Sequence, residues 1–482
     1  MSWREFKVVL VVFIGATICG GHVINKDRAT REKLTTNLND CNKVEGFTEE
    51  LRDEIKSKSR DVERIMDLIL NGSERHSTYN ELALFCDTFG PRMSGSTSLN
   101  NAINYMMNKM KSDNNLVVYG EKAMIPKWEV GEQWAEVVKP VKHHMTILAL
   151  GKSVGTNGTL EAEVLVVNSF DQLGSLGRDG KVKGKVVVYN YNFTKYDESV
   201  RFRTDGASEA AKYGAAAALV RSVTQFSIYS PHTGVGSKSI PTAAITVEDA
   251  DFIQRWTDRD EQLIIRLHIN AVNYDDVESQ NTIGEIRGTT KPDEVVLISG
   301  HIDSWYNTQG AMDDGGGMMI SYKALDILSK LNLRAKRTLR TVLWTSEEFG
   351  LIGAQQYFEN HKHELDKFKV VMESDLGTFK PLGLSISNAE PLGQCIVNEV
   401  LKLTERIGTT KLDSNYEGSD IQLFTNAGVP SLSLANNNSR YFYYHHTSGD
   451  SMTVENPDDL DKSTILWAAS SYVLADLSVA IK

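Results

Sequence analysis

The sequence predicts an α/β protein whose mostly parallel sheet is flanked by helices, with a β-rich domain inserted into it. Three observations favour this fold class. From Val295 onward, short runs rich in Val, Ile and Leu alternate with helical patterns, which is typical of a parallel sheet. Several of these runs stop at acidic residues or histidines, and ligands gather where buried parallel strands end. Between residues 128 and 271 strand-like pieces surround one alanine-rich helix, which indicates an insertion.

The chain has 482 residues, which is enough for two or three domains. A hydrophobic content of 41% is ordinary for a globular protein. The net charge of −11 argues against a nucleic-acid partner, because contacts to phosphates need a basic face.

The N-terminal segment is expected to direct the chain through the ER and Golgi to the outside of the cell. Arg4 and Lys7 precede an apolar stretch that ends in small residues, which is typical of a cleaved signal peptide over residues 1–21. This stretch is too short to span a bilayer comfortably, and a buried strand is the less favoured alternative. Residues 22–44 are expected to be an N-terminal extension or propeptide. No stable membrane span is expected elsewhere.

The sequence contains few cysteines and several glycosylation motifs. Once Cys19 leaves with the signal peptide, Cys41, Cys86 and Cys395 remain, which allows at most one disulfide. If Cys41 lies in a removed propeptide, Cys86 and Cys395 could pair, and the sequence leaves this open. Four Asn-X-Ser/Thr motifs predict glycosylation in surface loops, at Asn71, Asn157, Asn192 and Asn437.

The main domain is expected to consist of residues 45–127 and 272–482. In the first part, apolar residues recur at helical spacing between 49 and 70, and an amphipathic helix is expected over 99–111. The spaced apolar residues of the first helix are Ile55, Val62, Met66 and Ile69. In the second part, each strand-like run precedes a helix, and the expected helices include residues 392–406 and 459–480.

The inserted domain is expected to span residues 128–271. Strand-like pieces cover 159–167 and 184–192, and one helix is expected over the alanine-rich residues 208–220. None of the residues discussed below as metal ligands lies in this region.

Five residues of metal-ligand type follow apolar runs in the second part of the main domain. They are His301, Asp313, Glu348, Asp375 and His446. One Asp that bridges, two His and two further carboxylates would give each of two zinc ions a nitrogen and oxygens. This is the composition of a hydrolytic two-metal site.

The pair Glu347 and Glu348 is the most specific part of this pattern. Two consecutive carboxylates directly after a buried strand are costly unless metal or protons compensate them. Their side chains point in different directions, so Glu348 can bind zinc while Glu347 takes a proton from water. Adjacent Asp313 and Asp314 precede three glycines, and ordinary helix capping is an equally good explanation for these two residues alone.

Two further acids are expected to orient the histidines. Asp303 follows His301 by two residues, and Asp450 follows His446 by four, so each could accept the second ring N–H of its histidine. His445 is an alternative ligand to His446, and the spacing to Asp450 favours His446.

In this order, GHID, DDGGG, TSEEFG and HHTSGD resemble the co-catalytic zinc aminopeptidase family that includes glutamate carboxypeptidase and the transferrin receptor. Three further segments resemble one member of this family in particular. The resemblance extends over nearly all of the chain after about residue 45. These segments are residues 126–140, 148–156 and 445–454.

The resemblance implies a zinc pair bridged by Asp313. It implies that His301 and Asp375 bind one ion and that Glu348 and His446 bind the other. It implies Glu347 as general base and a protease-associated domain over residues 128–271. It further implies a homodimer that hydrolyses dipeptides in the secretory pathway, outside the cell or in the lysosome.

Two alternatives stay open on the same fold. A non-catalytic binding protein would be expected to lose zinc ligands, yet all five and the base are present. A glutaminyl cyclase-like amide chemistry would keep the metals, and the insertion argues against it. Arg92 and Arg440 are single candidates for binding a substrate carboxylate, and a structural role is the favoured interpretation of each. Unblocked dipeptides are the expected substrates.

Overall fold

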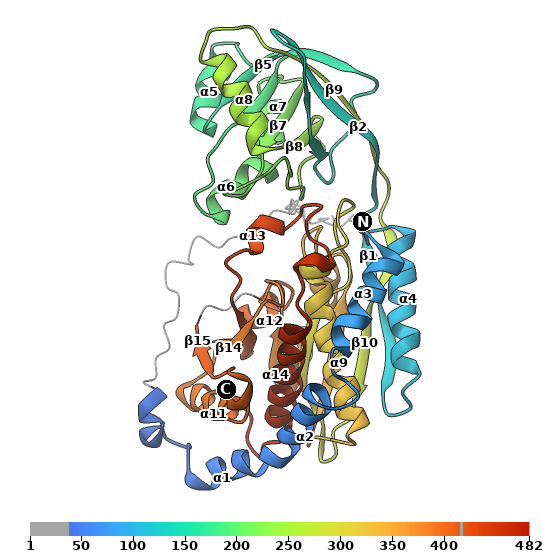
Figure 1. Cartoon of the computed structure of the whole chain (residues 1–482), viewed down its shortest axis with the longest axis vertical. Helices are drawn as coiled ribbons and strands as arrows, with labels where there is room; N and C mark the ends of the chain where they lie inside the picture. The colour runs from blue at the N-terminus through green and yellow to red at the C-terminus, as the bar shows by residue number, and fades with distance from the viewer. Residues whose placement is uncertain (1–37, 415–417, 482) are drawn as a thin grey trace, which may run out of the picture.

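The computed structural model describes residues 38–414 and 418–481, and the predicted signal peptide lies outside this range. The chain forms two lobes, each built around an eight-stranded sheet (Figure 1). The first and last parts of the chain build the larger lobe, and residues between them build the smaller one.

The sheet of the larger lobe has the order β1-β10-β12-β11-β13-β16-β14-β15. Its central strands β12, β11, β13 and β16 are parallel. The pairs β1 with β10, β10 with β12 and β14 with β16 are antiparallel, and β15 runs parallel to β14. The predicted α/β class is therefore confirmed. The strands are β1 (Val117–Ile125), β10 (Val277–Ile286), β11 (Lys291–His301), β12 (Arg337–Trp344), β13 (Phe368–Glu373), β14 (Pro381–Ser387), β15 (Lys411–Asp413) and β16 (Ser431–Asn436).

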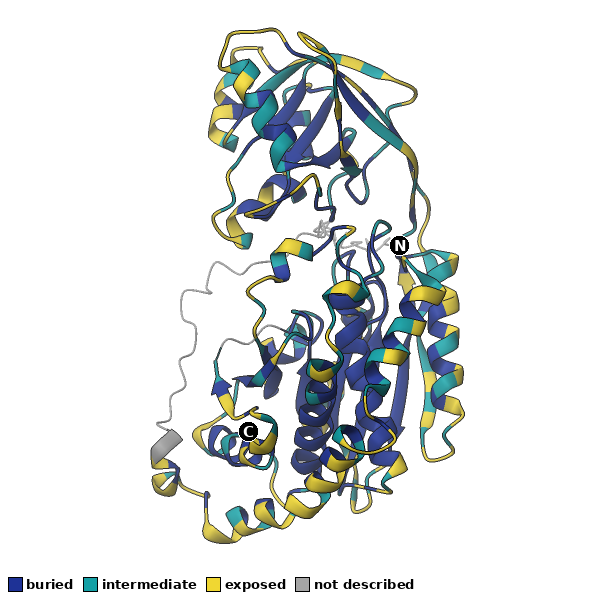
Figure 2. Cartoon of the chain, in the orientation of Figure 1, coloured by how far each residue is buried: buried dark blue, intermediate teal, exposed yellow. Residues whose placement is uncertain are grey.

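Two buried helices pack together on this sheet, α9 (Gly316–Lys330) and α14 (Pro457–Asp476). Figure 2 shows them dark blue over most of their length, with exposed residues on the outer helices. Their apolar side chains join one core cluster with the parallel strands, and each fully buried Leu or Met contributes about 1.5–3 kcal/mol. The outer helices are α1 (Glu49–Ser57), α2 (Ser59–Leu70), α3 (Ser77–Phe89), α4 (Thr97–Lys111), α10 (Ile352–His361), α11 (Pro391–Lys402), α12 (Gln422–Asn426) and α13 (Tyr441–Tyr444).

The helix predicted over residues 49–70 is two helices, α1 and α2. Lys58 separates them, and its ammonium group forms an ion pair with Asp476 at the end of α14. Both helices still bury the predicted apolar face, including Ile55 and Val62. A periodic pattern shows which face is buried, whereas it carries no sign of the contact at this break, whose partner is 418 residues away.

The sheet of the smaller lobe has the order β3-β2-β9-β5-β6-β7-β8-β4, and its first and last strands in the chain begin at Trp128 and end at Asn273. Four helices cover it, so the expectation of one helix is wrong. The strands are β2 (Trp128–Lys139), β3 (His143–Met145), β4 (Ile147–Ala149), β5 (Leu160–Val167), β6 (Val186–Tyr189), β7 (Ala217–Arg221), β8 (Thr242–Ile245) and β9 (Ile264–Asn273). The helices are α5 (Phe170–Arg178), α6 (Tyr196–Thr204), α7 (Gly206–Ala211) and α8 (Val247–Thr257).

The alanine-rich segment 208–220 also differs from its prediction. Only its beginning is helical, in α7, and its end is the buried strand β7 between parallel neighbours β6 and β8. Strands buried on both faces lose the alternation that marks a strand, so a short apolar run cannot be distinguished from a buried helix by its period.

One disulfide joins Cys41, in the short helix η1 (Leu38–Lys43), to Cys395 in α11. The alternative pairing of Cys86 with Cys395 is therefore wrong. Cys86 lies in the buried face of α3 as a free thiol, and burial raises its pKa to about 12. The end of the predicted 22–44 extension is thus covalently attached to the larger lobe.

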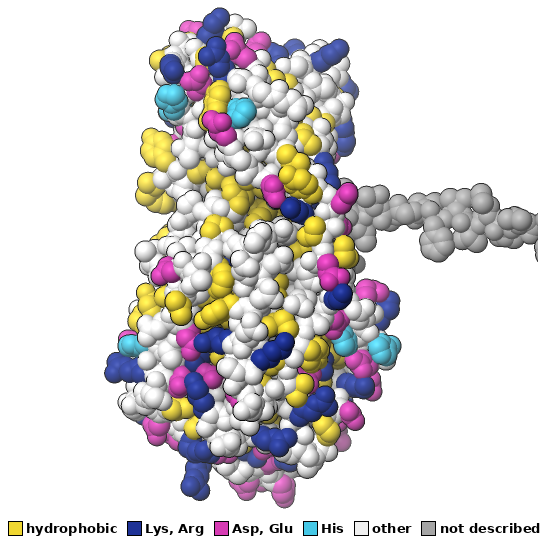
Figure 3. Space-filling view, turned by 90° about the vertical axis from the view of Figure 1, so that its right-hand side faces the viewer, with side chains coloured by type: hydrophobic (Ala, Val, Ile, Leu, Met, Phe, Trp, Pro, Cys, Tyr) yellow, Lys and Arg dark blue, Asp and Glu magenta, His cyan; other side chains and the backbone are white. Residues whose placement is uncertain are grey.

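Over residues 38–414 and 418–481, no helix combines the length and apolar character needed to cross a membrane. On the face in Figure 3, positive and negative side chains are interspersed, and apolar side chains gather at the narrowing between the lobes. The four asparagines of the glycosylation motifs are all exposed.

Candidate metal centre

The five predicted ligands come together at the carboxyl ends of the central strands, on the side of the larger lobe that faces the smaller one. His301 is the last residue of β11, and Asp375 follows β13 by two residues. Glu348 follows β12, and His446 follows α13. Asp313 lies in the short turn η2 (Ala311–Gly315) that leads into α9, and its own backbone angles are not helical. The parallel arrangement thus brings together residues that are far apart in the sequence.

One half of the site surrounds His301. Its Nε2 lies 3.2 Å from Asp313 Oδ1 and 3.2 Å from Asp375 Oδ1. Glu347 Oε2 lies 3.9 Å from the same nitrogen. The imidazole and the two nearest carboxylates have ligand atoms within 4.8 Å of one another, which suits one ion.

The other half surrounds His446. Its Nε2 lies 2.9 Å from Glu348 Oε2 and 3.4 Å from Asp313 Oδ2. His445 Nε2 lies 3.7 Å from the same Asp313 oxygen, and the two histidine rings stack with centroids 3.6 Å apart. Asp313 therefore presents one oxygen to each half of the site.

These residues fit a bound cation. Asp313 Oδ2 is buried, and within the described part of the chain no hydrogen bond reaches it. A buried carboxylate oxygen without a partner is costly, so its environment calls for a ligand. Histidine nitrogens with carboxylate oxygens are the donor set that zinc prefers, and they suit it better than the oxygen-only sets of magnesium and calcium.

Electrostatics support the same conclusion. Burial raises the pKa of Glu347 and Glu348 well above the usual range, and the neighbouring carboxylates raise both further. Burial also opposes ionisation of Asp313, but the hydrogen bond from His301 and the charges of both histidines lower its pKa. So many buried carboxylates can be ionised together only if a cation compensates them.

Glycines allow η2 and α9 to approach β11 closely. A Cβ atom at Gly317 would lie 1.9 Å from the carbonyl oxygen of Ser374, and one at Gly300 would lie 2.4 Å from the backbone nitrogen of Met318. Asp314 uses this space, accepting hydrogen bonds from the backbone N–H groups of His301 (3.0 Å) and Gly317 (3.1 Å). The capping role considered for Asp314 is thereby confirmed.

Asp303 supports the site differently from the prediction. His301 Nδ1 lies 3.1 Å from the backbone carbonyl oxygen of Asp303 and 3.7 Å from its carboxylate. The carboxylate instead accepts hydrogen bonds from the backbone N–H groups of Glu347 (2.9 Å) and Glu348 (3.2 Å). Asp303 therefore orients His301 through its main chain and the two glutamates through its side chain.

Asp450 does not orient His446 as predicted. Its carboxylate accepts hydrogen bonds from the backbone N–H groups of Met312 (2.7 Å) and Asp313 (3.3 Å), so it fixes the turn that carries Asp313. His446 Nδ1 instead lies 3.1 Å from the carbonyl oxygen of Thr233. Asp450 is close in sequence to His446, but both of its carboxylate oxygens accept hydrogen bonds from backbone N–H groups of η2 instead.

The smaller lobe therefore contributes residues that the sequence did not reveal. Thr233 pairs with His446 twice, because its own N–H donates to the His446 carbonyl oxygen (3.1 Å). Arg203 of α6 donates to the Thr233 carbonyl oxygen (2.9 Å) and to the Tyr196 hydroxyl (2.8 Å). The rings of Tyr196 and His445 form a T-shaped pair with centroids 5.5 Å apart. No local motif marks these residues, and they reach the site only through folding.

The two arginines considered for substrate binding have other environments. Arg92 is fully buried and donates to backbone carbonyl oxygens, which gives it a structural role. These acceptors are Gly90, Ile302, Gln309 and Gly310. Arg440 is exposed and lies over the ring of Tyr444, with 5.8 Å to the centroid.

Comparisons with known proteins agree with this site. Residues 281–471 match the family described as Peptidase family M28. Carboxypeptidase Q of Mus musculus is 46% identical, with 89% of this chain and 92% of the relative covered. Carboxypeptidase Q of Homo sapiens is 43% identical, with 98% of each chain covered. The resemblance of residues 126–140, 148–156 and 445–454 to plasma glutamate carboxypeptidase, also called carboxypeptidase Q, is thereby confirmed.

Solved structures agree as well. A peptidase M28 precursor from Shewanella amazonensis superposes with a TM-score of 0.82 at 28% identity, covering 89% of this chain and 99% of that one. A zinc aminopeptidase from Bacillus subtilis shares the fold, with a TM-score of 0.63 at 19% identity, covering 82% and 93%. With relatives of this identity over most of its length, the chain belongs to peptidase family M28 and is a metallopeptidase.

Proposed function

We propose that this zinc exopeptidase hydrolyses short peptides, above all unblocked dipeptides, at a site for two zinc ions. The observation that carries the proposal is the position of Asp313, whose two carboxylate oxygens face different histidines. In the proposed arrangement, Asp313 bridges the ions, His301 and Asp375 complete one site, and Glu348 and His446 complete the other.

Zinc held by these residues would polarise a carbonyl oxygen and make water more acidic. Glu347 is proposed as the general base. Its backbone N–H is held by Asp303, and its carboxylate lies beside His301 without being needed in either ligand set. In this role, the Glu347 carboxylate takes the proton of the attacking water and then delivers it to the nitrogen that leaves.

The site's surroundings favour short substrates. Thr233, Arg203 and Tyr196 of the smaller lobe lie against the histidines, so they limit the room above the carboxyl ends of the strands. The carboxylates of Glu347 and Asp375 suit a free α-amino group. The name of the relatives indicates action at a free carboxyl terminus. A dipeptide satisfies both requirements because its single bond adjoins both termini.

Further properties belong to the same proposal. We propose that residues 128–271 form an inserted domain of the protease-associated type and that the enzyme is a homodimer. We also propose that the chain is secreted or reaches the lysosome, with glycans on its exposed Asn-X-Ser/Thr motifs. The similarity to carboxypeptidase Q supports these points.

The test uses full-length protein produced through a secretory host. Its zinc content is measured, and its rate is compared on free, N-acetylated and C-amidated versions of one dipeptide. About two zinc ions per chain and rapid hydrolysis of the free dipeptide alone are expected. Equal rates on the acetylated and free forms would overturn the substrate assignment. A protein that lacks zinc, or that cyclises N-terminal glutamine instead, would overturn the reaction.

A further inference from the structure

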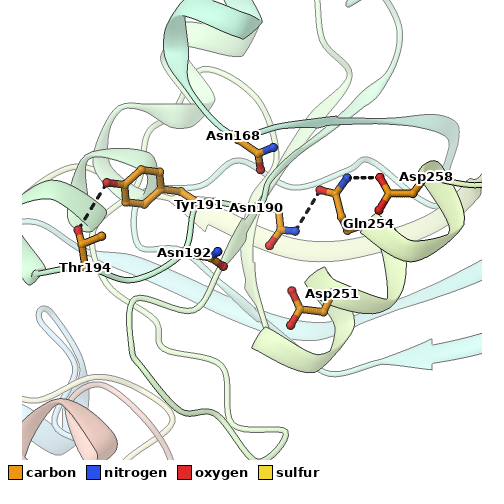
Figure 4. A pocket seen from close by; sticks show the side chains of 8 residues that line it. All are labelled: Asn168, Asn190, Tyr191, Asn192, Thr194, Asp251, Gln254 and Asp258. Carbon is orange, nitrogen blue, oxygen red and sulfur yellow. Dashed lines mark hydrogen bonds between the residues drawn. The ribbon is translucent and has the colours of Figure 1, made fainter.

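A polar pocket lies on the smaller lobe, and none of its lining residues is a candidate metal ligand (Figure 4). Its volume of about 560 Å³ is within the roughly 300–1,000 Å³ typical of small-molecule sites. Such sites are mostly apolar, whereas amides and carboxylates dominate this one. They belong to Asn168, Asn190, Asn192, Asp251, Gln254 and Asp258.

A chain of hydrogen bonds fixes the polar side chains of the pocket. Arg221 donates to the side-chain oxygen of Asn190 (2.8 Å) and forms an ion pair with Asp251. The Asn190 amide donates to Gln254 (3.2 Å), whose amide donates to Asp258 (2.9 Å). Asn190 is buried and Asp258 is exposed, so this series of hydrogen bonds extends from the protein interior to the rim of the pocket. The side chains are thus ordered before any ligand arrives.

The chemistry of this lining selects a ligand rich in hydroxyl groups. Amides both donate and accept, and each carboxylate can accept at more than one lone pair, which matches the alternating needs of sugar hydroxyls. A phosphate is disfavoured because Arg221 is already paired with Asp251. A divalent cation is disfavoured for the same reason, since that pair compensates the Asp251 charge. Tyr191 adds an aromatic ring at the edge of the pocket, as carbohydrate sites often need an apolar surface beside the polar one.

The pocket contains its own attachment point for a sugar. Asn192 is exposed, lines the pocket and begins the motif Asn192-Phe193-Thr194. We propose that the pocket holds the first sugar residues of an N-linked glycan on Asn192. Attachment forms a bond from Asn192 Nδ2 to the sugar C1. The amide loses a proton, and a diphosphate-activated oligosaccharide donor loses its C1–O bond.

A glycan bound in this pocket would stabilise the contact between the smaller and the larger lobe that Phe193 makes. Phe193, the middle residue of the motif, packs against Phe442 of α13 with ring centroids 6.2 Å apart. His446 follows α13 by two residues. The proposal does not depend on peptidase activity, and it requires only that the chain enters the compartment where N-glycans are attached.

The test measures glycan release from the native full-length protein by a peptide N-glycosidase, site by site, using mass spectrometry. Asn157 is the reference because it is an exposed motif in the same lobe. Release at Asn192 is expected to be about tenfold slower than at Asn157. Tenfold corresponds to about 1.4 kcal/mol, the scale of one or two net hydrogen bonds. After denaturation the two rates should be equal.

Pocket variants identify the cause of the protection. Gln254→Ala and Asp258→Asn are expected to bring release at Asn192 close to that at Asn157, while release at Asn157 stays unchanged and reports that the lobe is folded. Arg255→Ala is the matched control, because Arg255 is exposed on the same helix and does not line the pocket. An unmodified Asn192, equal native rates at the two sites, or the same effect from Arg255→Ala and the pocket variants would each overturn the proposal.

Discussion

Asp313 shows how one side chain can organise the whole site. Its two oxygens face different histidines, and its backbone N–H is fixed by Asp450. The turn that carries it must be close to β11, which the glycines at 300 and 317 allow. The bridging role proposed for Asp313 therefore rests on a side chain that faces both halves of the site and on a backbone held by Asp450.

Glu347→Gln should lower turnover by about 10²–10⁴-fold, the usual effect of losing a general base. The amide preserves the volume of the side chain but cannot accept a proton from water. Because Glu347 is assigned to neither ligand set, zinc content should not change. Steady-state kinetics with metal analysis on the same preparation checks both points. Near-normal turnover would remove Glu347 from this role.

His446→Ala should reduce zinc content and activity far more than His445→Ala. His446 Nε2 lies 2.9 Å from Glu348, and its other nitrogen is held by Thr233. His445 stacks on the His446 ring and lies farther from Asp313. Losing His445 should therefore loosen the packing around His446 but leave His446 in place to bind zinc. Zinc retained during titration with a chelator measures the difference. If His445→Ala proves the more severe change, the ligand assignment moves to His445.

Among the secondary-structure elements, α14 combines a buried body with a polar N-terminus. Asn456 caps its first turn, and Asp461 accepts hydrogen bonds from the backbone N–H of His76 at 3.0 and 3.1 Å. Burial raises the pKa of Asp461 to about 6. The helix thus contains a carboxylate whose ionisation opposes folding, although its hydrogen bonds attach α14 to the start of α3.

Asp461→Asn should change how stability depends on pH. The unfolded pKa is near 3.9 and the folded pKa is about 6, so the favourable contribution of Asp461 is complete below about pH 4 and is lost as pH rises through 6. A pKa difference of two units corresponds to at most about 3 kcal/mol of folding stability. Between pH 4 and 7, the free energy of unfolding of the wild type should fall relative to the variant. Denaturant titrations at several pH values measure this free energy. If it changes with pH in the same way for the wild type and the variant, Asp461 does not have a raised pKa in the folded protein.

The sequence predicted the elements whose signals are local. The alternation of strands and helices after Val295 and the helix 99–111 follow from periodicity, and the structure contains them. The break at Lys58 and the strand β7 were missed. The break lies at an ion pair with Asp476, which is far away in the sequence, and β7 is buried on both faces. At the site, strand ends predicted the five residues that the fold brings together, whereas Thr233 and Arg203 have no pattern that would identify them.

At the scale of the whole molecule, the two lobes meet at the metal centre. Thr233 and His446 exchange hydrogen bonds across this boundary, and Thr224 Oγ1 donates to the Phe442 carbonyl oxygen (2.8 Å) nearby. The smaller lobe therefore holds His446, the residue proposed as a metal ligand. With His446 in its proposed role, we expect metal binding to depend on the relative position of the lobes.

Arg203→Ala tests this coupling. Arg203 donates to the same Thr233 carbonyl oxygen that accepts from His446, and a Cβ atom at Gly234 would lie 2.3 Å from its guanidinium carbon, so its position is tightly constrained. Losing it should free the Thr233 loop and lower zinc affinity by roughly 10–100-fold, as outer partners of metal ligands usually do. Arg201→Ala is the matched control, because Arg201 is exposed on the same helix. Competition for zinc with a chelator measures the affinity. If both variants bind zinc equally well, the smaller lobe does not support His446, and its contact with the site affects only the substrate.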